Sequence, residues 1–126
     1  GFLGGQDKLA ALVDADVVVQ PSRYEQAAWA PIEAVLCGTP VIVSRNSGAG
    51  EDVRRMDAGH LVEYGDKRQL VQTIEEILND PSKAKEKVSR AKEYVHSNLR
   101  FSDKVEDYER LYQECIKADM QSRRRK

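Results

Sequence analysis

Three short runs of apolar, mostly β-branched residues constrain the fold of this chain more than any other feature. The first is "ADVVVQPS" at residues 15–22, the second is "TPVIVS" at 39–44, and the third, weaker one is "GHLVEYG" at 59–65. Short continuous apolar runs are typical of strands that are buried on both faces, as in a parallel sheet. We therefore expect three buried strands that belong to one parallel sheet.

Helical patterns lie between these runs. An apolar stripe at residues 9–13 precedes the first strand, and residues 31–36 predict a helix with Pro31 at its first position and Gly38 just past its end. After the second strand, "NSGAGEDVRRM" predicts a polar glycine loop that runs into a short helix. The alternation of strand and helix predicts βαβ units with right-handed crossovers.

The second half of the chain is predicted to be helical, in three amphipathic segments. The sequence "NDPS" separates the first two, with Asp80 as N-cap and Pro81 in the first turn, and the third begins near Ser102. The residues expected to face the core are Leu70, Val71, Ile74, Ile77 and Leu78, then Ala84, Val88, Ala91 and Val95, and finally Val105, Tyr108, Leu111, Tyr112 and Cys115.

These patterns predict an α/β fold, a partial Rossmann-like domain with a short parallel sheet flanked by helices and a helical C-terminal half. Nucleotide-binding sheets of this type usually have five or six strands, so three strands favour a domain that is incomplete at its N-terminal side. We expect residues 1–118 to form this domain and residues 119–126 to form a disordered basic tail.

Charge and composition exclude several classes of function. The net charge of −1 argues against a general nucleic-acid binder. Cys37 and Cys115 make no metal spacing, and His60 and His96 have no ligand-spaced partners, so we expect no metal site. No apolar run reaches the roughly 18 residues of a membrane span, and no signal peptide occurs. We expect a cytoplasmic protein, with peripheral association at the inner face of the membrane through residues 123–126 as an alternative.

The ligand site of an open α/β sheet lies beyond the carboxyl ends of its strands. Three segments are expected there, namely residues 21–25, 44–51 and 64–66. The helix that begins at Pro31 would point its positive N-terminal end at the same place. Such an end can hold an anion such as a phosphate group.

Two glutamates flank this turn, since "YEQAAWAPIEA" places Glu25 and Glu33 with seven residues between them. A carboxylate only accepts hydrogen bonds, so each suits a vicinal diol of a ribose or a hexose. Together with an anion site they suit a ligand with phosphates in the middle and a sugar at each end. The alternative is structural: Glu33 would be a capping residue at the third helical position and Glu25 a solvated loop charge.

The segment "PSRYEQAAWAPIEAVLCGTPVIVS" at residues 21–44 resembles the signature of the retaining glycosyltransferases with the GT-B fold, the group 1 family that includes glycogen synthases and many mannosyl- and glucosyltransferases. The shared pattern is a glutamate, seven residues, and a glutamate followed by alanine. The resemblance extends over nearly the whole chain, through "FLGGQDKLAALVDADVVVQPS", "SGAGEDV", "AGHLVEYGDKRQLVQTIEEILNDP" and "FSDKVEDYERLY". It implies the C-terminal, nucleotide-sugar-binding domain of such an enzyme.

The resemblance also implies roles for particular residues. Glu25 would be the catalytic group that contacts hydroxyls of the donor sugar, and Glu33 would hold the ribose. The other donor-binding residues would be Ser22, Gln26, Ala27, Ala28, Trp29, Gly48 and Glu51. Of these, Glu51 has an alternative role, in which it only compensates the dipole of its own helix.

In this family the sugar is transferred with retention, without a protein nucleophile, a metal or another cofactor, and the enzyme contributes positioning and charge stabilisation. The implied partners are a nucleotide-sugar donor and a glycan or lipid-linked acceptor bound by a missing N-terminal domain. The family's Arg and Lys that neutralise the diphosphate are absent from this chain, so this fragment alone is expected to be inactive. The family usually has glycine-aromatic-glycine after the first glutamate, whereas this chain has Gln26-Ala27-Ala28, which leaves less room for close backbone approach.

Three alternatives remain at this point. A receiver-like signalling module has a similar length, but its acidic pair, phosphorylated aspartate and lysine are not found. A nucleotide-sugar epimerase shares the GT-B fold, and a catalytically inactive scaffold would share it too. The segment "DAD" at residues 14–16 matches an Asp-x-Asp metal motif, but it precedes the first strand and so belongs to the edge opposite the expected site.

Overall fold

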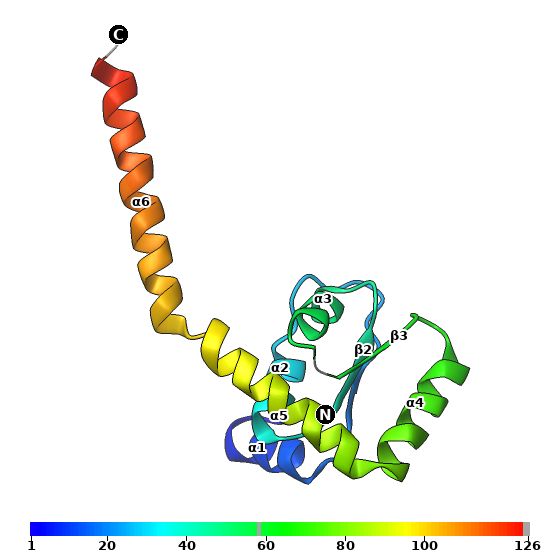
Figure 1. Cartoon of the computed structure of the whole chain (residues 1–126). Coiled ribbons are helices and arrows are strands. Elements are labelled where there is room, and N and C mark those ends of the chain that lie inside the picture. Colours follow the sequence, from blue (N-terminus) through cyan, green and yellow to red (C-terminus); the bar gives the residue numbers. More distant parts are fainter. Residues whose placement is uncertain (58, 125–126) are drawn as a thin grey trace. The chain divides into compact units, whose positions relative to one another are not determined.

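The computed structural model describes residues 1–57 and 59–124. The described chain divides into two compact units, residues 1–95 and 96–126. The elements in chain order are α1 (Gly5–Asp14), β1 (Val18–Gln20), α2 (Trp29–Cys37), β2 (Val41–Ser44), α3 (Gly48–Arg55), β3 (His60–Val62), α4 (Lys67–Asn79), α5 (Pro81–Asn98) and α6 (Phe101–Arg124) (Figure 1). The alternation of helices and strands confirms the predicted α/β class.

The three strands form one parallel sheet in the order β1-β2-β3. In the register, Val19 lies opposite Ile42 and Val43 lies opposite Leu61. The strands are shorter than the apolar runs that predicted them. One reason is that Pro21 and the proline before β2 have no N–H to donate to a ladder, so each marks a strand end.

The first unit packs a core on both faces of the sheet. Val41 and Val43 face a cluster built from α2, α3 and α5, whereas Ile42 faces a cluster that contains Val62 and Ile77. Figure 1 shows α2 and α3 on one side of the sheet and α4 on the other. Successive residues of a strand point to opposite faces, so burial of all four β2 residues means that both faces are covered.

Helix α2 begins two residues earlier than predicted. Its first residue is Trp29, so Pro31 is the third helical residue rather than the first. A proline is tolerated there because amides of the first turn have no intrahelical acceptor. The predicted end is confirmed, since Gly38 has φ 90° and its N–H donates to the carbonyl of Val35 at 3.0 Å. The shift makes Glu33 the fifth helical residue, so the predicted capping position is wrong.

The apolar stripes of α4 and α5 largely face the core. The stripe of α5 is fully buried, and Asp80 caps this helix by accepting from the N–H of Lys83 at 3.1 Å. In α4, Ile77 is buried and Leu70 and Ile74 are half-buried, whereas Val71 and Leu78 are exposed.

The prediction for the last helix is wrong in one respect. Helix α6 forms, but its apolar residues Val105, Tyr108, Leu111, Tyr112 and Cys115 are exposed within their unit. A helical period shows which face is apolar and does not show what covers it. The helix continues to Arg124, into the segment predicted to be a basic tail, and residues 125–126 lie outside the described residues. None of the helices in the described part of the chain combines the length and hydropathy that a membrane span requires.

Candidate functional site

The loop after β1 holds the first glutamate in an unusual state. Gln20, the last residue of β1, donates its side-chain amide to Glu25 Oε2 at 3.3 Å and to Ser22 Oγ at 3.5 Å. The other carboxylate oxygen, Glu25 Oε1, is buried and receives no hydrogen bond from the described residues. A buried acceptor without a donor is costly, and a hydroxyl group of a ligand would satisfy it.

The same loop lies directly on the start of α3. The N–H of Gly48 donates to the carbonyl of Glu25 at 2.9 Å. A Cβ atom at Gly48 would lie 1.9 Å from the carbonyl oxygen of Gln26 and 2.9 Å from the nitrogen of Ala27, so only glycine fits. Ser47 caps α3 by accepting from the N–H of Gly50 at 3.0 Å. The cap, the glycine and the loop therefore form one packed unit at the carboxyl edge of the sheet.

The second glutamate lies on α2 and has a partner from another helix. Lys8 Nζ on α1 lies 2.8 Å from Glu33 Oε1, and both side chains are partly exposed. The N-cap position of α2 is Ala28, which makes no side-chain cap. Because Glu33 is paired with Lys8 and lies beyond the first turn, it does not cap the helix.

The remaining predicted residues are mostly exposed or are paired within their own helix. Gln26, Ala27 and Trp29 are exposed, and Ala28 is half-buried. The carboxylate of Glu51 pairs within its own helix, with Arg54 and, at 3.1 Å, with Arg55. Among the predicted residues, Ser22 and Glu25 therefore contact Gln20. The segment of Glu25, Gln26 and Ala27 packs against Gly48. Glu51 makes the ion pairs expected of a residue that stabilises its own helix.

Sequence reasoning missed three residues that contact the predicted glutamates or lie at this edge. Gln20 is the polar last residue of the strand that leads to Glu25, and this position could have identified it from the sequence as a neighbour of Glu25. Lys8 could not be found, because the ion pair joins residues 25 positions apart. Arg45 directly follows β2, and its Nε donates at 2.7 Å to Glu63, which follows β3.

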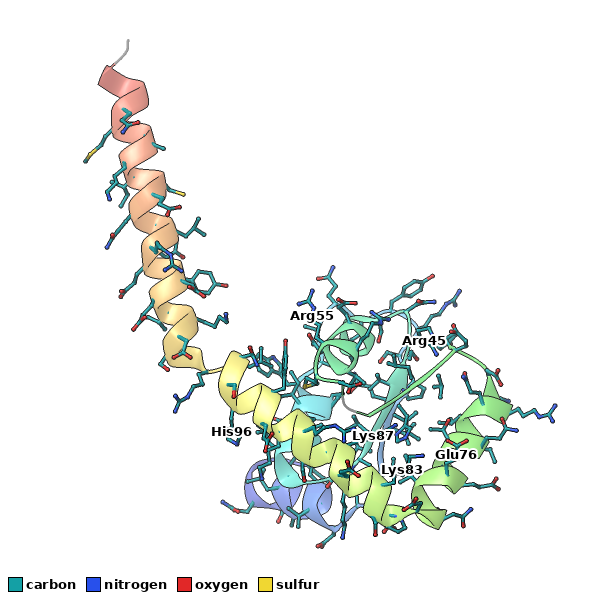
Figure 2. All side chains as sticks on the ribbon, in the orientation of Figure 1. Arg45, Arg55, Glu76, Lys83, Lys87 and His96 are labelled. Atoms are coloured by element: carbon teal, nitrogen blue, oxygen red, sulfur yellow. The ribbon has the colours of Figure 1, made fainter. Side chains whose placement is uncertain are left out.

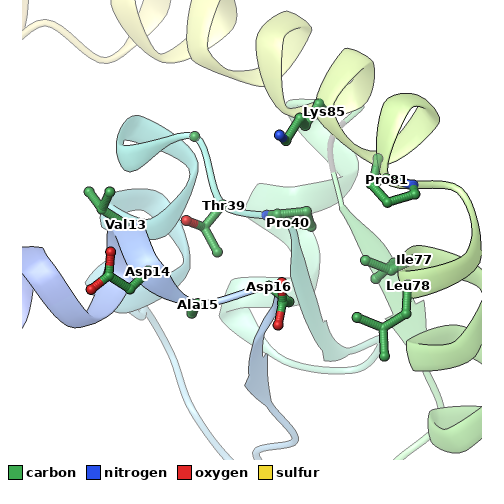
Figure 3. Close-up of a pocket in the computed structure, with 12 residues that line it drawn as sticks. Val13, Asp14, Ala15, Asp16, Thr39, Pro40, Ile77, Leu78, Pro81 and Lys85 are labelled. Carbon is green, nitrogen blue, oxygen red and sulfur yellow. The ribbon is translucent and has the colours of Figure 1, made fainter.

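Cavities occur at both edges of the sheet. At the carboxyl edge, a cavity of about 310 Å³ is lined by Pro21 after β1 and by Tyr64 and neighbouring residues after β3. At the amino edge, a cavity of about 280 Å³ is lined by Asp14, Asp16 and Lys85 among others (Figure 3). The "DAD" segment therefore lies at the edge predicted for it, away from the two glutamates. Within the described chain, no group of three or more His, Cys, Asp and Glu side chains is arranged to hold a metal ion.

A charged cluster surrounds His60 at the start of β3. Its Nε2 lies 3.3 Å from Lys87 Nζ, and Glu76, Asp80 and Lys83 line the same cavity of about 240 Å³. Of these residues, Figure 2 labels Glu76, Lys83 and Lys87. Burial lowers the pKa of His60 below its usual value. The positive charges of Lys87 and Lys83 lower that pKa further, while Glu76 opposes them.

This cluster predicts a loss of stability in mild acid. The unfolded chain binds a proton at His60 near pH 6.5 and the folded chain does so only at lower pH. The contribution of this group to stability is therefore complete above about pH 6.5 and declines as the pH falls through the lowered value. We expect the drop in melting temperature between pH 7.5 and pH 5 to be smaller in His60→Gln than in the unsubstituted chain. The exposed His96→Gln is the control, and an unchanged drop in His60→Gln would contradict the prediction.

Comparisons with known proteins show which family this chain resembles. The family described as "Glycosyl transferases group 1" matches residues 1–94. The N-acetyl-alpha-D-glucosaminyl L-malate synthase of Bacillus anthracis is 31% identical over 119 residues, which are 94% of this chain and 31% of that protein. A glycogen synthase of Mycobacterium tuberculosis is 31% identical over 79% of this chain and 24% of its own length.

A solved structure is similar in fold as well as in sequence. The sucrose-phosphate synthase from Thermosynechococcus elongatus superimposes with a TM-score of 0.80 and 32% identity, over 94% of this chain and 30% of that one. This similarity confirms the predicted fold class. The chain spans about a third or less of the length of these relatives.

Proposed function

The chain belongs to the glycosyl transferases group 1 family, and on this premise we propose that it is the donor-binding part of a retaining glycosyltransferase. The enzyme would move a sugar from a nucleotide-sugar to a glycan or lipid-linked acceptor, and the acceptor would be bound outside this chain. The signalling and epimerase alternatives are not favoured, because the named relatives and the solved structure described above are synthases of the transferase type.

The observation that carries this proposal is the state of the Glu25 carboxylate. One of its oxygens is held by Gln20, and the other is buried with no donor among the described residues. This is the arrangement expected of a group that completes its hydrogen bonding with a sugar hydroxyl. Glu33, on the helix that follows, would accept hydrogen bonds from the ribose diol.

The chemistry asked of these residues is positioning and charge stabilisation. With the sugar held by Glu25 and the ribose by Glu33, the reacting carbon and the diphosphate between them would be fixed relative to the acceptor. The diphosphate would leave and take the acceptor proton on the same face of the sugar, so no protein nucleophile, metal ion or other cofactor is needed in this scheme.

The test is a donor screen on the full-length protein. Melting temperatures are measured with UDP-, GDP- and ADP-sugars, and we expect one nucleotide class to stabilise the protein, because a ligand that binds only the folded state raises its stability. Glu33→Ala should abolish this stabilisation. Glu63→Ala is the matched control, because Glu63 is a paired glutamate at the same edge. No shift with any donor would contradict the proposed function, and a retained shift in Glu33→Ala would contradict the ribose assignment.

A further inference from the structure

We infer that Lys8 is a positioning residue for donor binding, whose ammonium group orients the Glu33 carboxylate toward the ribose of the nucleotide. This inference rests on the proposed function. The direct observation is the distance of 2.8 Å between Lys8 Nζ and Glu33 Oε1. No hydrogen bond from the described residues reaches the other oxygen, Oε2, which therefore stays free to accept from a ligand.

The pair joins the two helices that flank β1 in the chain. Helix α1 leads into β1, and its last residues line the cavity at the amino edge. Helix α2 follows β1 and starts at the carboxyl edge, with Glu33 in its second turn. Lys8 therefore contacts the helix whose start lies at the edge where the ligand of such a sheet is expected.

The two glutamates of the site share one arrangement. Gln20 occupies one oxygen of Glu25, and Lys8 occupies one oxygen of Glu33. In each carboxylate the second oxygen receives no hydrogen bond from the described part of the protein. A neighbour that fixes one oxygen also fixes the rotamer, so the ligand does not have to order the side chain when it binds.

Three arginines near this edge are held by other carboxylates. Arg45 is paired with Glu63, and Arg54 and Arg55 are paired with Glu51. Removing the ammonium group of Lys8 should therefore leave the Glu33 side chain mobile. The affinity for a nucleotide with a ribose should then fall, whereas the affinity for a nucleotide without the ribose hydroxyls should not. A general attraction between Lys8 and the diphosphate would instead lower the affinity for every nucleotide equally.

The test compares a nucleoside diphosphate with its 2′,3′-dideoxy analogue, by calorimetry on the full-length protein. We expect the unsubstituted protein to prefer the ribose form by about tenfold or more, because a hydrogen bond to a charged group is lost in the analogue. In Lys8→Met this preference should fall by about three- to tenfold, with the affinity for the dideoxy analogue unchanged within about twofold. Lys8→Arg should keep most of the preference.

Lys67→Met is the matched control, because Lys67 is an exposed cation beside the cavity at the carboxyl edge. Its ribose preference should remain that of the unsubstituted protein. The melting temperature of Lys8→Met should change little, since partly exposed ion pairs contribute little to stability.

The outcomes separate the two proposals. If nucleotides bind but Lys8→Met keeps the full ribose preference, or loses affinity equally for both ligands, the role of Lys8 is refuted while the proposed function stands. If the unsubstituted protein binds no nucleotide, the proposed function fails and the inference about Lys8 fails with it.

Discussion

Glu25→Gln is expected to lower sugar transfer by the full-length protein about 100- to 1,000-fold, the usual effect of removing one preorganised polar contact to the reacting group. The substitution removes the negative charge that would face the donor sugar. It also places an amide beside the amide of Gln20, which now donates to Glu25 Oε2 at 3.3 Å. The new side-chain amide has two orientations. If its NH₂ group faces Gln20, two donors face each other. If its oxygen faces Gln20, its NH₂ group occupies the buried position of Oε1, where a sugar hydroxyl would have to donate.

The measurement is kcat/KM with the donor identified in the screen, together with the affinity for the nucleoside diphosphate alone. Because Glu25 is proposed to contact the sugar, the affinity for the nucleoside diphosphate should change by no more than about twofold. This change is much smaller than the expected loss of kcat/KM. Glu63→Gln serves as the control and should transfer normally, because Glu63 is exposed and paired with Arg45. Normal transfer by Glu25→Gln would refute the catalytic assignment, and an equal loss of diphosphate affinity would move Glu25 to the nucleotide side.

The sequence predicted the framework of the site because the framework depends on local patterns. The run "TPVIVS" identified β2, whose four residues are all buried, and Gly38 marked the end of α2 correctly. The start of α2 was misplaced, because a proline fits any position of the first turn and therefore does not identify the first residue. That error of two residues made Glu33 look like a capping residue.

Contacts between distant segments could not be predicted. The ion pair of Lys8 and Glu33 depends on how α1 packs beside α2, and neither residue carries a local signal for it. The resemblance implied that Gly48 binds the donor, and this stays a prediction; what no local pattern indicated is its close packing against Gln26 and Ala27. The apolar face of α6 was identified, yet the pattern held no information about what would cover Tyr108 or Leu111.

Gly48→Ala is expected to weaken donor binding by at least about tenfold through the backbone of the site rather than through a lost contact. The added methyl group would lie 1.9 Å from the carbonyl oxygen of Gln26, and a backbone atom cannot rotate away as a side chain can. The loop must therefore move. Its movement would break the bond from the N–H of Gly48 to the carbonyl of Glu25, which is 2.9 Å long. Overpacking of this kind costs about 1–3 kcal/mol of stability.

Gly65→Ala is the matched control, because it separates a general cost of replacing glycine from a specific effect on the loop. Gly65 has φ +83° with no atom within 4 Å of its Cβ position, so the substitution strains the backbone by about 1–3 kcal/mol without a clash. Both variants should lose similar stability, but only Gly48→Ala should shift the amide resonances of residues 24–28 and lose donor affinity. Equal donor affinity in the two variants would show that the loop of residues 24–28 binds the donor even when it is displaced. The packing of α3 against this loop would then have no role in holding Glu25.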